Sequence, residues 1–300
     1  MKPVSACLWC GAPLGPDARR AGGRTTCPRC GSQTTDPAPD AAELEAAYGD
    51  WYRPADGAKR YHLGGDAFLG RSRALLAGRL DAAAPPGPIL DVGAGDGSLL
   101  DALTARGRRV TGLERGAMRA DFVDLPIEDI EGDDSWAAVV FWHSLEHLPH
   151  PREAIRQAAR LLVPGGVVVV AVPNVDSIQA RLFGDRWLHL DLPRHLVHLR
   201  TASLREGLER DGFTVGEVSN LRGGQNVIGW LDGLVALLPG GLDFYQAMRK
   251  PEARKHPMTR AQQILAIAAG VALAPVAILG TLVEAASGRG GIVYVEAQLG

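Results

Sequence analysis

The sequence predicts an α/β fold in which a doubly wound sheet follows a small cysteine-rich module. Three observations carry this prediction. All four cysteines lie within the first thirty residues, strand-like apolar runs then alternate with helical patterns, and a long uncharged run precedes the last strand. We expect residues 1–35 to form the first module and residues 36–59 a linker with an entry helix. Residues 60–300 form the large domain, with a helical, apolar insertion at 221–290.

The composition is that of an ordinary globular protein. Hydrophobic residues make up 46% of the 300 residues and charged residues 22%, which argues against disorder and coiled coil. The formal net charge is −2, so the basic surplus typical of nucleic-acid-binding proteins is missing. The N-terminus lacks the pattern of a secretory signal, so we expect a cytoplasmic protein.

The four cysteines have the spacing of a structural zinc site. Cys7 and Cys10 form one C-x2-C pair, and Cys27 and Cys30 form a second pair sixteen residues later. Each pair can place two sulfurs on one tight turn, and two such turns supply four thiolates for tetrahedral Zn²⁺. Two disulfides or free thiols are the alternatives, and a reducing compartment disfavours the disulfides. The module therefore resembles a zinc ribbon, and its zinc would be structural.

A glycine-rich turn follows the first strand of the large domain. Ile89–Val92 is a short apolar run that leads into Gly93, Gly95 and Gly97, and a helical pattern covers residues 98–106. A strand, a glycine turn and a helix in this order bring backbone N–H groups close to a bound ligand. The turn therefore predicts a ligand site at this edge of the sheet.

An acidic residue indicates what kind of ligand the turn binds. A second strand over residues 109–113 ends at Glu114, twenty-one residues after Gly93. A carboxylate at this distance can accept hydrogen bonds from ribose hydroxyls. A dinucleotide-binding turn would have glycine or alanine at the sixth position, where this chain has Ser98. We therefore expect a nucleoside-containing cofactor other than a dinucleotide.

The stretch Leu90-Asp-Val-Gly-Ala-Gly-Asp-Gly97 resembles motif I of the class I S-adenosylmethionine-dependent methyltransferases. In that family the acid before the first glycine helps to hold the methionine part of the cofactor, which implies this role for Asp91. A carboxylate is favourable beside a cationic ligand and would repel a pyrophosphate. The resemblance implies cofactor contacts by Asp91, Gly93, Ala94, Gly95, Gly97 and Glu114.

Further motifs extend the resemblance over residues 60–220 and the last strand. Trp136–Trp142 reads as a strand followed by His-Ser-Leu-Glu-His-Leu, and Arg160 begins an R-x-L-x-P-G-G stretch. Residues 187–195, Trp-Leu-His-Leu-Asp-Leu-Pro-Arg-His, are similar to a segment of one methyltransferase subfamily. The resemblance implies a Rossmann-like, seven-stranded methyltransferase sheet that ends in the strand Ile292–Leu299.

Two histidines are candidates for catalysis. His143 directly follows a strand at the edge where open α/β sheets bind ligands, so we expect it to contact cofactor or substrate. His195 lies in the segment where this family builds its acceptor pocket. Either imidazole can take a proton from an oxygen or nitrogen acceptor. The alternatives are that His143 is only part of the pocket wall and that His195 only hydrogen-bonds its own loop.

The second crossover of the sheet departs from the family pattern. Between Glu114 and a third strand around residues 120–123 there are too few residues for an ordinary crossover helix. This shortening affects the side of the site that binds adenine in the family. We predict Asp124 and Leu125 for the adenine side.

The insertion contains two apolar stretches. Residues 264–283 carry no charge and are long enough to cross a bilayer, and residues 227–238 are apolar except for Asp232. A single crossing would separate the last strand from the sheet, so residues 264–283 are expected to form a membrane hairpin broken near Pro275, an interfacial helix, or a buried cap over the pocket. The basic segment 249–260 between the stretches fits contact with anionic lipid at the inner face of the membrane.

Together these features predict a methyltransferase that acts on a small-molecule or amphiphilic, lipid-like acceptor. One alternative is an RNA methyltransferase whose zinc ribbon recognises the substrate, which the near-neutral charge disfavours. Another is a zinc-ribbon adaptor that binds S-adenosylmethionine without turnover. The acceptor, the methylated atom and the oligomeric state are not determined by the sequence.

Overall fold

A computed structural model gives the fold and describes residues 3–52, 60–62, 64–116, 119–220 and 223–300. Residues 53–59 of the expected linker lie outside the described residues. The strands are β1 (Arg20–Ala21), β2 (Arg24–Thr26), β3 (Gln33–Thr35), β4 (Ile89–Val92), β5 (Val110–Leu113), β6 (Phe122–Val123), β7 (Trp136–Trp142), β8 (Leu162–Pro173), β9 (Val197–His198), β10 (Phe213–Ser219) and β11 (Ile292–Leu299). The helices are α1 (Ala41–Tyr52), α2 (Gly65–Ala83), α3 (Ser98–Thr104), α4 (Pro151–Leu161), α5 (Ile178–Phe183), α6 (Thr201–Arg210), α7 (Gly223–Ala236), α8 (Phe244–Met248) and α9 (Arg260–Ser287).

The large domain is built on one seven-stranded sheet with the strand order β10-β11-β8-β7-β4-β5-β6. β4 pairs in parallel with β5 and β7, and β7 pairs in parallel with β8. Only the last strand, β11, runs antiparallel, between β8 and β10. The predicted doubly wound, Rossmann-like sheet is confirmed.

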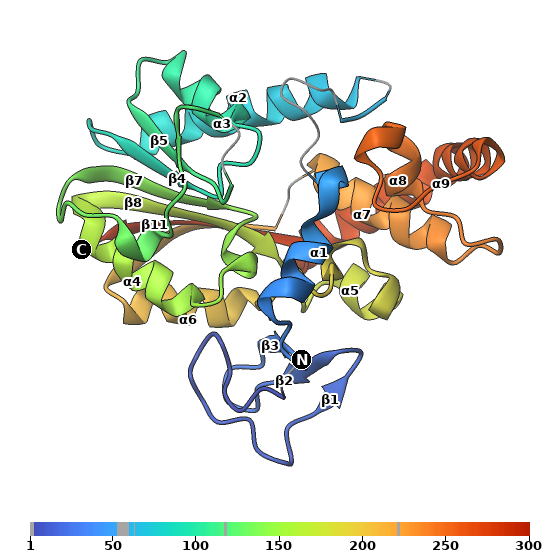
Figure 1. Cartoon of the computed structure of the whole chain (residues 1–300), viewed down its shortest axis with the longest axis horizontal. Coiled ribbons are helices and arrows are strands. Elements are labelled where there is room, and N and C mark those ends of the chain that lie inside the picture. Colours follow the sequence, from blue (N-terminus) through green and yellow to red (C-terminus); the bar gives the residue numbers. More distant parts are fainter. Residues whose placement is uncertain (1–2, 53–59, 63, 117–118, 221–222) are drawn as a thin grey trace.

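Helices cover both faces of this sheet. Figure 1 shows α2 and α3 on one face and α4 and α6 on the other. β8 is a valine-rich strand that is buried on both sides, and its side chains alternate between the two cores. Val168 and Val170 belong to the core beneath α4 and α6, whereas Val167 and Val169 belong to the core beneath α2. The parallel strands therefore end at one common edge, and their following loops form the site.

The second crossover is short, as expected. β6 has two residues and pairs with β5, and the described residues between them form turns rather than a helix. This leaves the outer edge of the sheet thinly covered near Glu114.

The N-terminal module is joined to the large domain by a shared sheet. β1, β2 and β3 form an antiparallel ribbon, and β9 from the large domain adds to its edge, with Gln33 opposite His198. Trp9 is 2% exposed and donates a hydrogen bond from its Nε1 to the carbonyl oxygen of Ser203 in α6, at 2.7 Å. Gly207 leaves space for that indole, because a Cβ there would lie 2.3 Å from a Trp9 ring carbon. The ribbon is therefore packed against α6 of the large domain.

The insertion between β10 and β11 is helical, and it corrects two expectations for residues 264–283. α9 is one continuous helix through Pro275, so the hairpin is wrong. Proline removes one backbone donor, and the alanine-rich turns on both sides have enough helix propensity to continue. The buried cap is also wrong, because most large side chains of α9 are exposed. By contrast, the stretch 227–238 packs inward through Trp230, Leu231 and Val235.

Candidate active site

The glycine turn lies at the carboxyl end of β4. Gly93 and Gly95 have φ values of 77° and 61°, in the left-handed region that favours glycine. A Cβ on Gly93 would lie 2.5 Å from the Cβ of Ser144, whereas a Cβ on Gly95 would meet no atom within 4 Å. Gly93 is thus required for close packing inside the protein, and Gly95 faces open space that a ligand can fill.

Asp91 is buried directly beneath this turn, with 2% of its surface exposed. Burial raises the pKa of its carboxyl group to about 7, and the negative charges of Glu114 and Asp96 add to the effect, while the Arg73 guanidinium opposes it. A ligand cation would stabilise the carboxylate at this position. The site therefore fits the sulfonium and ammonium groups of S-adenosylmethionine.

Glu114 follows the end of β5 and lies against the same turn. Its Oε2 accepts a hydrogen bond from the Gly95 amide at 2.8 Å. Asp124 accepts a hydrogen bond from the Gly116 amide at 3.0 Å, and Leu125 is 47% exposed. Gly97 precedes α3 with φ 76°. The roles predicted for Glu114, Asp124, Leu125 and Gly97 in cofactor binding stay predictions.

One cavity of about 1190 Å³ connects the glycine turn to the helical insertion. Near β4 it is lined by Asp91, Gly93, Ala94 and Gly95, and it passes His143 on the way to α7 and α8. Among the described residues, Gly97, Glu114, Asp124 and Leu125 do not line it. The cavity exceeds the volume of a single small ligand, so it has room for a cofactor and an acceptor side by side.

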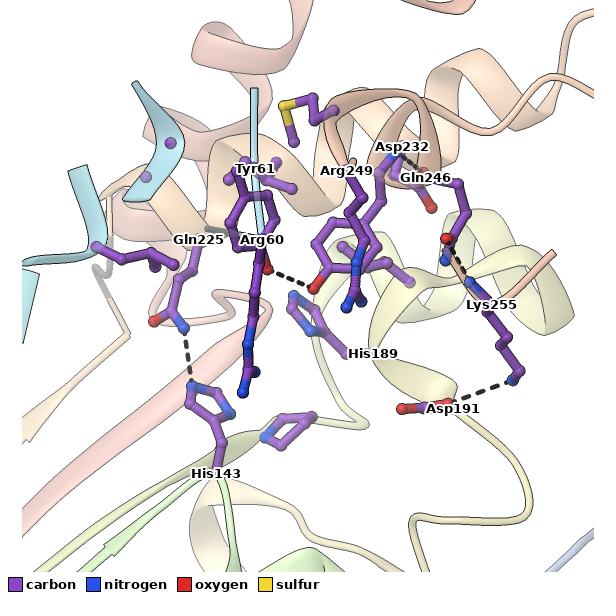
Figure 2. Close-up of a pocket in the computed structure, with 18 of the residues that line it drawn as sticks. Arg60, Tyr61, His143, His189, Asp191, Gln225, Asp232, Gln246, Arg249 and Lys255 are labelled. Carbon is purple, nitrogen blue, oxygen red and sulfur yellow. Dashed lines mark hydrogen bonds and ion pairs between the residues drawn. The ribbon is translucent and has the colours of Figure 1, made fainter. Parts of the chain in front are cut away.

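His143 lies at the centre of this cavity, directly after β7. Its φ of 55° is unusual for a residue other than glycine and marks a strained position. The Gln225 side-chain nitrogen lies 3.1 Å from His143 Nε2, and Figure 2 shows the two side chains facing each other. Because an amide nitrogen can only donate, Nε2 is the acceptor and the proton is on Nδ1. That Nδ1 lies 3.5 Å from Glu146 Oε1.

Glu146 is buried among three histidines, an arrangement that sequence reasoning missed. It is 1% exposed, and neither carboxylate oxygen has a hydrogen-bond partner among the residues that the structure describes. Burial opposes its ionisation, but the neighbouring His143 and His147 outweigh burial and hold its pKa below the ordinary value. The Glu-His pair at 146–147 was visible in the sequence, but the approach of His195 from another loop was not.

Glu146, His147 and His195 can also hold a divalent cation. One ligand atom from each lies within 4.8 Å of the others. His195 donates from Nδ1 to the His189 carbonyl oxygen at 2.9 Å, so its Nε2 accepts and faces Glu146 Oε1 at 3.9 Å. Nitrogen and carboxylate donors of this kind suit several divalent metals.

The far half of the cavity is aromatic and basic. The hydroxyl groups of Tyr61 and Tyr245 lie 2.8 Å apart, and the Arg249 guanidinium lies over both rings (Figure 2). Lys255 reaches Asp191 at 3.7 Å. The expectation that the whole segment 249–260 faces lipid is therefore wrong for Arg249, which is 5% exposed, and for Lys255, which lines the cavity.

The four cysteines of the ribbon are gathered around one point. The Sγ atoms of Cys7 and Cys30 are 3.7 Å apart, and those of Cys10 and Cys27 are 3.5 Å apart. A tetrahedral zinc with Zn–S bonds of about 2.3 Å separates its sulfurs by about 3.8 Å, whereas a disulfide bond is only about 2.05 Å long. The sulfur positions therefore fit a zinc ion better than disulfides.

The ribbon also contacts the loop that carries His195. Thr35 donates a hydrogen bond from its hydroxyl to the His195 carbonyl oxygen, and the Leu196 carbonyl accepts one from the Thr35 amide. The module thus holds one wall of the cavity, a link that neither segment reveals by itself.

Comparison with known proteins agrees with this geometry. A family model described as a methyltransferase domain matches residues 65–218, just over half of the chain. The ubiquinone biosynthesis O-methyltransferase of Marinobacter nauticus is 29% identical over 208 residues, which cover 61% of this chain and 84% of that protein. The protein of the same name from Erwinia tasmaniensis is 33% identical over 107 residues, or 30% of this chain and 43% of that protein.

Several solved structures align with this chain at low sequence identity. The [4+2]-cyclase SpnF aligns with a TM-score of 0.49 and 20% identity, covering 87% of this chain and 97% of its own. The 1,6-didemethyltoxoflavin-N1-methyltransferase of Burkholderia thailandensis, solved with S-adenosylhomocysteine, aligns with a TM-score of 0.45 and 17% identity, covering 67% of this chain and 89% of its own.

Proposed function

This chain belongs to the class I S-adenosylmethionine-dependent methyltransferases, and on that premise we propose that it methylates a small amphiphilic molecule bound beside His143. The observation that carries the proposal is the single cavity that joins the glycine turn to the aromatic and basic pocket of the insertion. His143 lies between the two halves, where a cofactor and an acceptor would meet.

We assign the cofactor half to the residues around β4. S-adenosylmethionine, when bound, supplies a methyl group on a positively charged sulfur. The ionised Asp91 would hold the cationic part, the turn from Gly93 to Gly95 would approach it closely, and Glu114 would accept hydrogen bonds from the ribose. The protein's contribution to the transfer is alignment and exclusion of water.

His143 is our candidate general base. Its unprotonated Nε2 points into the cavity and can take the proton from an acceptor hydroxyl or amine as the new bond to carbon forms. Glu146 keeps the proton on Nδ1 and stabilises the imidazolium that results. Gln225 from α7 occupies Nε2 now and would exchange places with the acceptor.

His195 is the weaker candidate for the base. Burial, followed by the charge of His147, holds its pKa well below the ordinary value. Its Nδ1 is engaged by the His189 carbonyl, so we assign it to positioning the loop and lining the pocket wall.

The acceptor half suits a molecule with a polar head and an apolar body. Tyr61, Tyr245 and Arg249 line one end, while Phe68 and Ile278 line another part of the same cavity. The curated relatives are named for ubiquinone biosynthesis, which supports a small-molecule acceptor. An RNA substrate has less support, because acids and bases alternate along the cavity walls and the chain carries a net charge of −2.

Zinc in the ribbon is a structural element of this proposal. Four thiolates leave no open coordination position, so the metal would fix the fold and take no part in the transfer.

Substitution of the base tests the assignment. With a panel of phenol, amine and carboxylic acid acceptors and detection of S-adenosylhomocysteine, we expect His143→Gln to lower kcat about 100-fold or more. Glu146→Gln should lower kcat, because the imidazolium loses its carboxylate partner, with cofactor affinity unchanged. His150→Gln, on an exposed histidine, is the matched control.

Two other results would contradict the proposal. Tight S-adenosylmethionine binding without product across the panel would favour a non-catalytic adaptor. Full activity of His143→Gln would show that His143 is not the general base.

A further inference from the structure

The outward face of α9 is apolar along its whole length. Residues 261–283 carry no charge, and the helix is long and apolar enough to span a membrane, although only 22% of its most apolar window is buried. Its exposed large side chains are Ile264, Leu265, Val271, Val276, Ile278, Leu279, Leu282 and Val283. We call these eight residues the α9 face.

The inward face of α9 is formed mainly by small residues, together with the half-buried Ile267 and Leu273. Gly270 lies against the ring of Phe244, and Gly280 against the indole of Trp230. The buried residues of the helix also include Ala266, Ala277 and Thr281. A helix of a water-soluble protein buries its large apolar residues and exposes polar ones, whereas α9 exposes eight of its large apolar side chains. The helix is built to present its large side chains to something outside the molecule.

The C-terminal end of α9 is held in place by buried hydrogen bonds. The buried Glu284 accepts hydrogen bonds from the backbone and side chain of Gln179 and from Trp230 Nε1. β11 begins at Ile292, five residues after the helix ends, and pairs with β8 and β10. At the start of the helix, Gln263 donates a side-chain hydrogen bond to the Ala247 carbonyl oxygen at 3.0 Å. Because both ends are tied to the folded domain, α9 cannot cross a bilayer and can only lie along a surface.

The charges around the α9 face favour an anionic surface. Residues 250–289 contain five basic side chains and two acidic ones, and one of the acids is the buried Glu284. Arg260 and Arg289 are exposed and flank the two ends of the helix. In a contact between two copies these like charges would approach one another, whereas an anionic bilayer would attract them.

The α9 face is continuous with the active-site cavity. Ile278 is 51% exposed and also lines the cavity, and Phe68 of α2 is 48% exposed and lines it as well. An apolar chain that leaves the cavity past Ile278 would therefore run onto the α9 face.

We propose that α9 lies in the headgroup region of an anionic membrane and that the cavity takes its acceptor from that membrane, with the reactive head beside His143 and the apolar tail along Ile278. The tail position rests on the proposed function; the membrane contact does not. Binding to the membrane keeps the enzyme beside the bilayer in which an amphiphilic acceptor is dissolved.

Vesicle flotation of the full chain tests the contact. We expect it to float with phosphatidylglycerol–phosphatidylcholine vesicles and at least tenfold less with phosphatidylcholine alone. Ile264→Gln/Val271→Gln/Leu279→Gln should reduce flotation at least tenfold, because the apolar insertion is lost. Arg260→Ala/Arg289→Ala should reduce it roughly fivefold for each charge. Leu182→Gln, an exposed apolar residue on α5, is the matched control.

Two further measurements keep the outcomes distinct. Calorimetric affinity for S-adenosylmethionine should be the same in the triple variant and the wild type, which shows that the variant is folded and separates a failed membrane contact from a failed cofactor site. Light scattering gives the oligomeric state. A wild-type dimer that the triple variant converts to monomer, without vesicle binding, would assign the α9 face to a second copy and overturn the proposal, as would equal flotation of wild type and triple variant.

Discussion

The ribbon and α9 are both additions to the same sheet, and they use apolar side chains in opposite ways. Trp9 of the ribbon is 2% exposed and fits against Gly207, whereas Leu279 of α9 is 62% exposed. Trp9 of the ribbon packs into the domain beneath it, whereas α9 packs mainly through small residues, Ile267 and Leu273, and exposes most of its large side chains. The difference indicates that the ribbon stabilises this chain and that α9 serves a contact beyond it.

The two additions also approach the cavity from different sides. Figure 1 shows the ribbon at the bottom of the view, next to α6, and α9 at the upper right, next to α8. The ribbon reaches the cavity through Thr35 and the backbone of His195, and α9 reaches it through Ile278. Both therefore act on the acceptor half. The following predictions test this contrast, beginning with the largest effect.

Metal removal should separate the ribbon from the sheet. Structural zinc contributes about 10 kcal/mol or more to folding of small modules. We expect one zinc per chain by elemental analysis. Chelation should abolish hydrogen-exchange protection in β2, β3 and β9, while β4, β7 and α9 remain protected. Retained protection of the ribbon after complete metal loss would show that its apolar contacts suffice.

Truncation of one large side chain in the ribbon and one in α9 compares how much each contributes to the stability of the fold. Trp9→Ala should lower the free energy of unfolding by about 3–5 kcal/mol, because it removes a buried indole and its hydrogen bond to the Ser203 carbonyl. Leu279→Ala should change it by no more than about 0.5 kcal/mol. Thermal unfolding with and without S-adenosylmethionine measures both, and similar losses would contradict the contrast.

Cofactor binding should depend on pH through Asp91, independently of both regions. The pKa of Asp91 in the empty site is about 7, above its ordinary value, so its proton must leave when a cation binds. S-adenosylmethionine affinity should fall about tenfold for each pH unit below 7. Because the pKa of Asp91 is raised in the folded protein, its protonated form favours folding. This contribution to stability is complete at pH values below the ordinary pKa of the carboxyl group and is lost as the pH rises towards 7.

Calorimetry at several pH values measures this dependence. Asp91→Asn should bind S-adenosylmethionine weakly, with an affinity that does not change with pH. The Trp9→Ala and Leu279→Ala variants should keep the wild-type pH profile. A flat profile for the wild type would show that another group holds the cation.

Loss of one hydroxyl should produce the smallest effect. Thr35→Val keeps the shape of the side chain and removes the hydroxyl contacts to the His195 carbonyl and to His198 Nε2, at a cost of about 1 kcal/mol for each hydrogen bond. We expect faster hydrogen exchange at residues 195–198 and unchanged affinity for S-adenosylmethionine. Slower or unchanged exchange would mean that the ribbon does not support this wall of the cavity.

Local patterns carried much of the prediction. The two cysteine pairs, the glycine turn with Asp91 and Glu114, and the alternation of strands and helices predicted the ribbon, the ligand edge and the sheet. The inclusion of Ile292–Leu299 in the sheet as its last strand was also predicted. These features depend on residues close together in the chain, where spacing alone sets which groups share a turn or a face.

Contacts between distant segments were decided by the tertiary structure. Glu146 lies among His143 and His195, Arg249 turned from an expected lipid contact into a cavity wall, and Thr35 joined the ribbon to that wall. The apolar content of residues 264–283 was evident from the sequence, but which side of α9 is buried was not. That choice depends on where Phe244 and Trp230 meet Gly270 and Gly280, and such packing arises only when the folded segments are brought together.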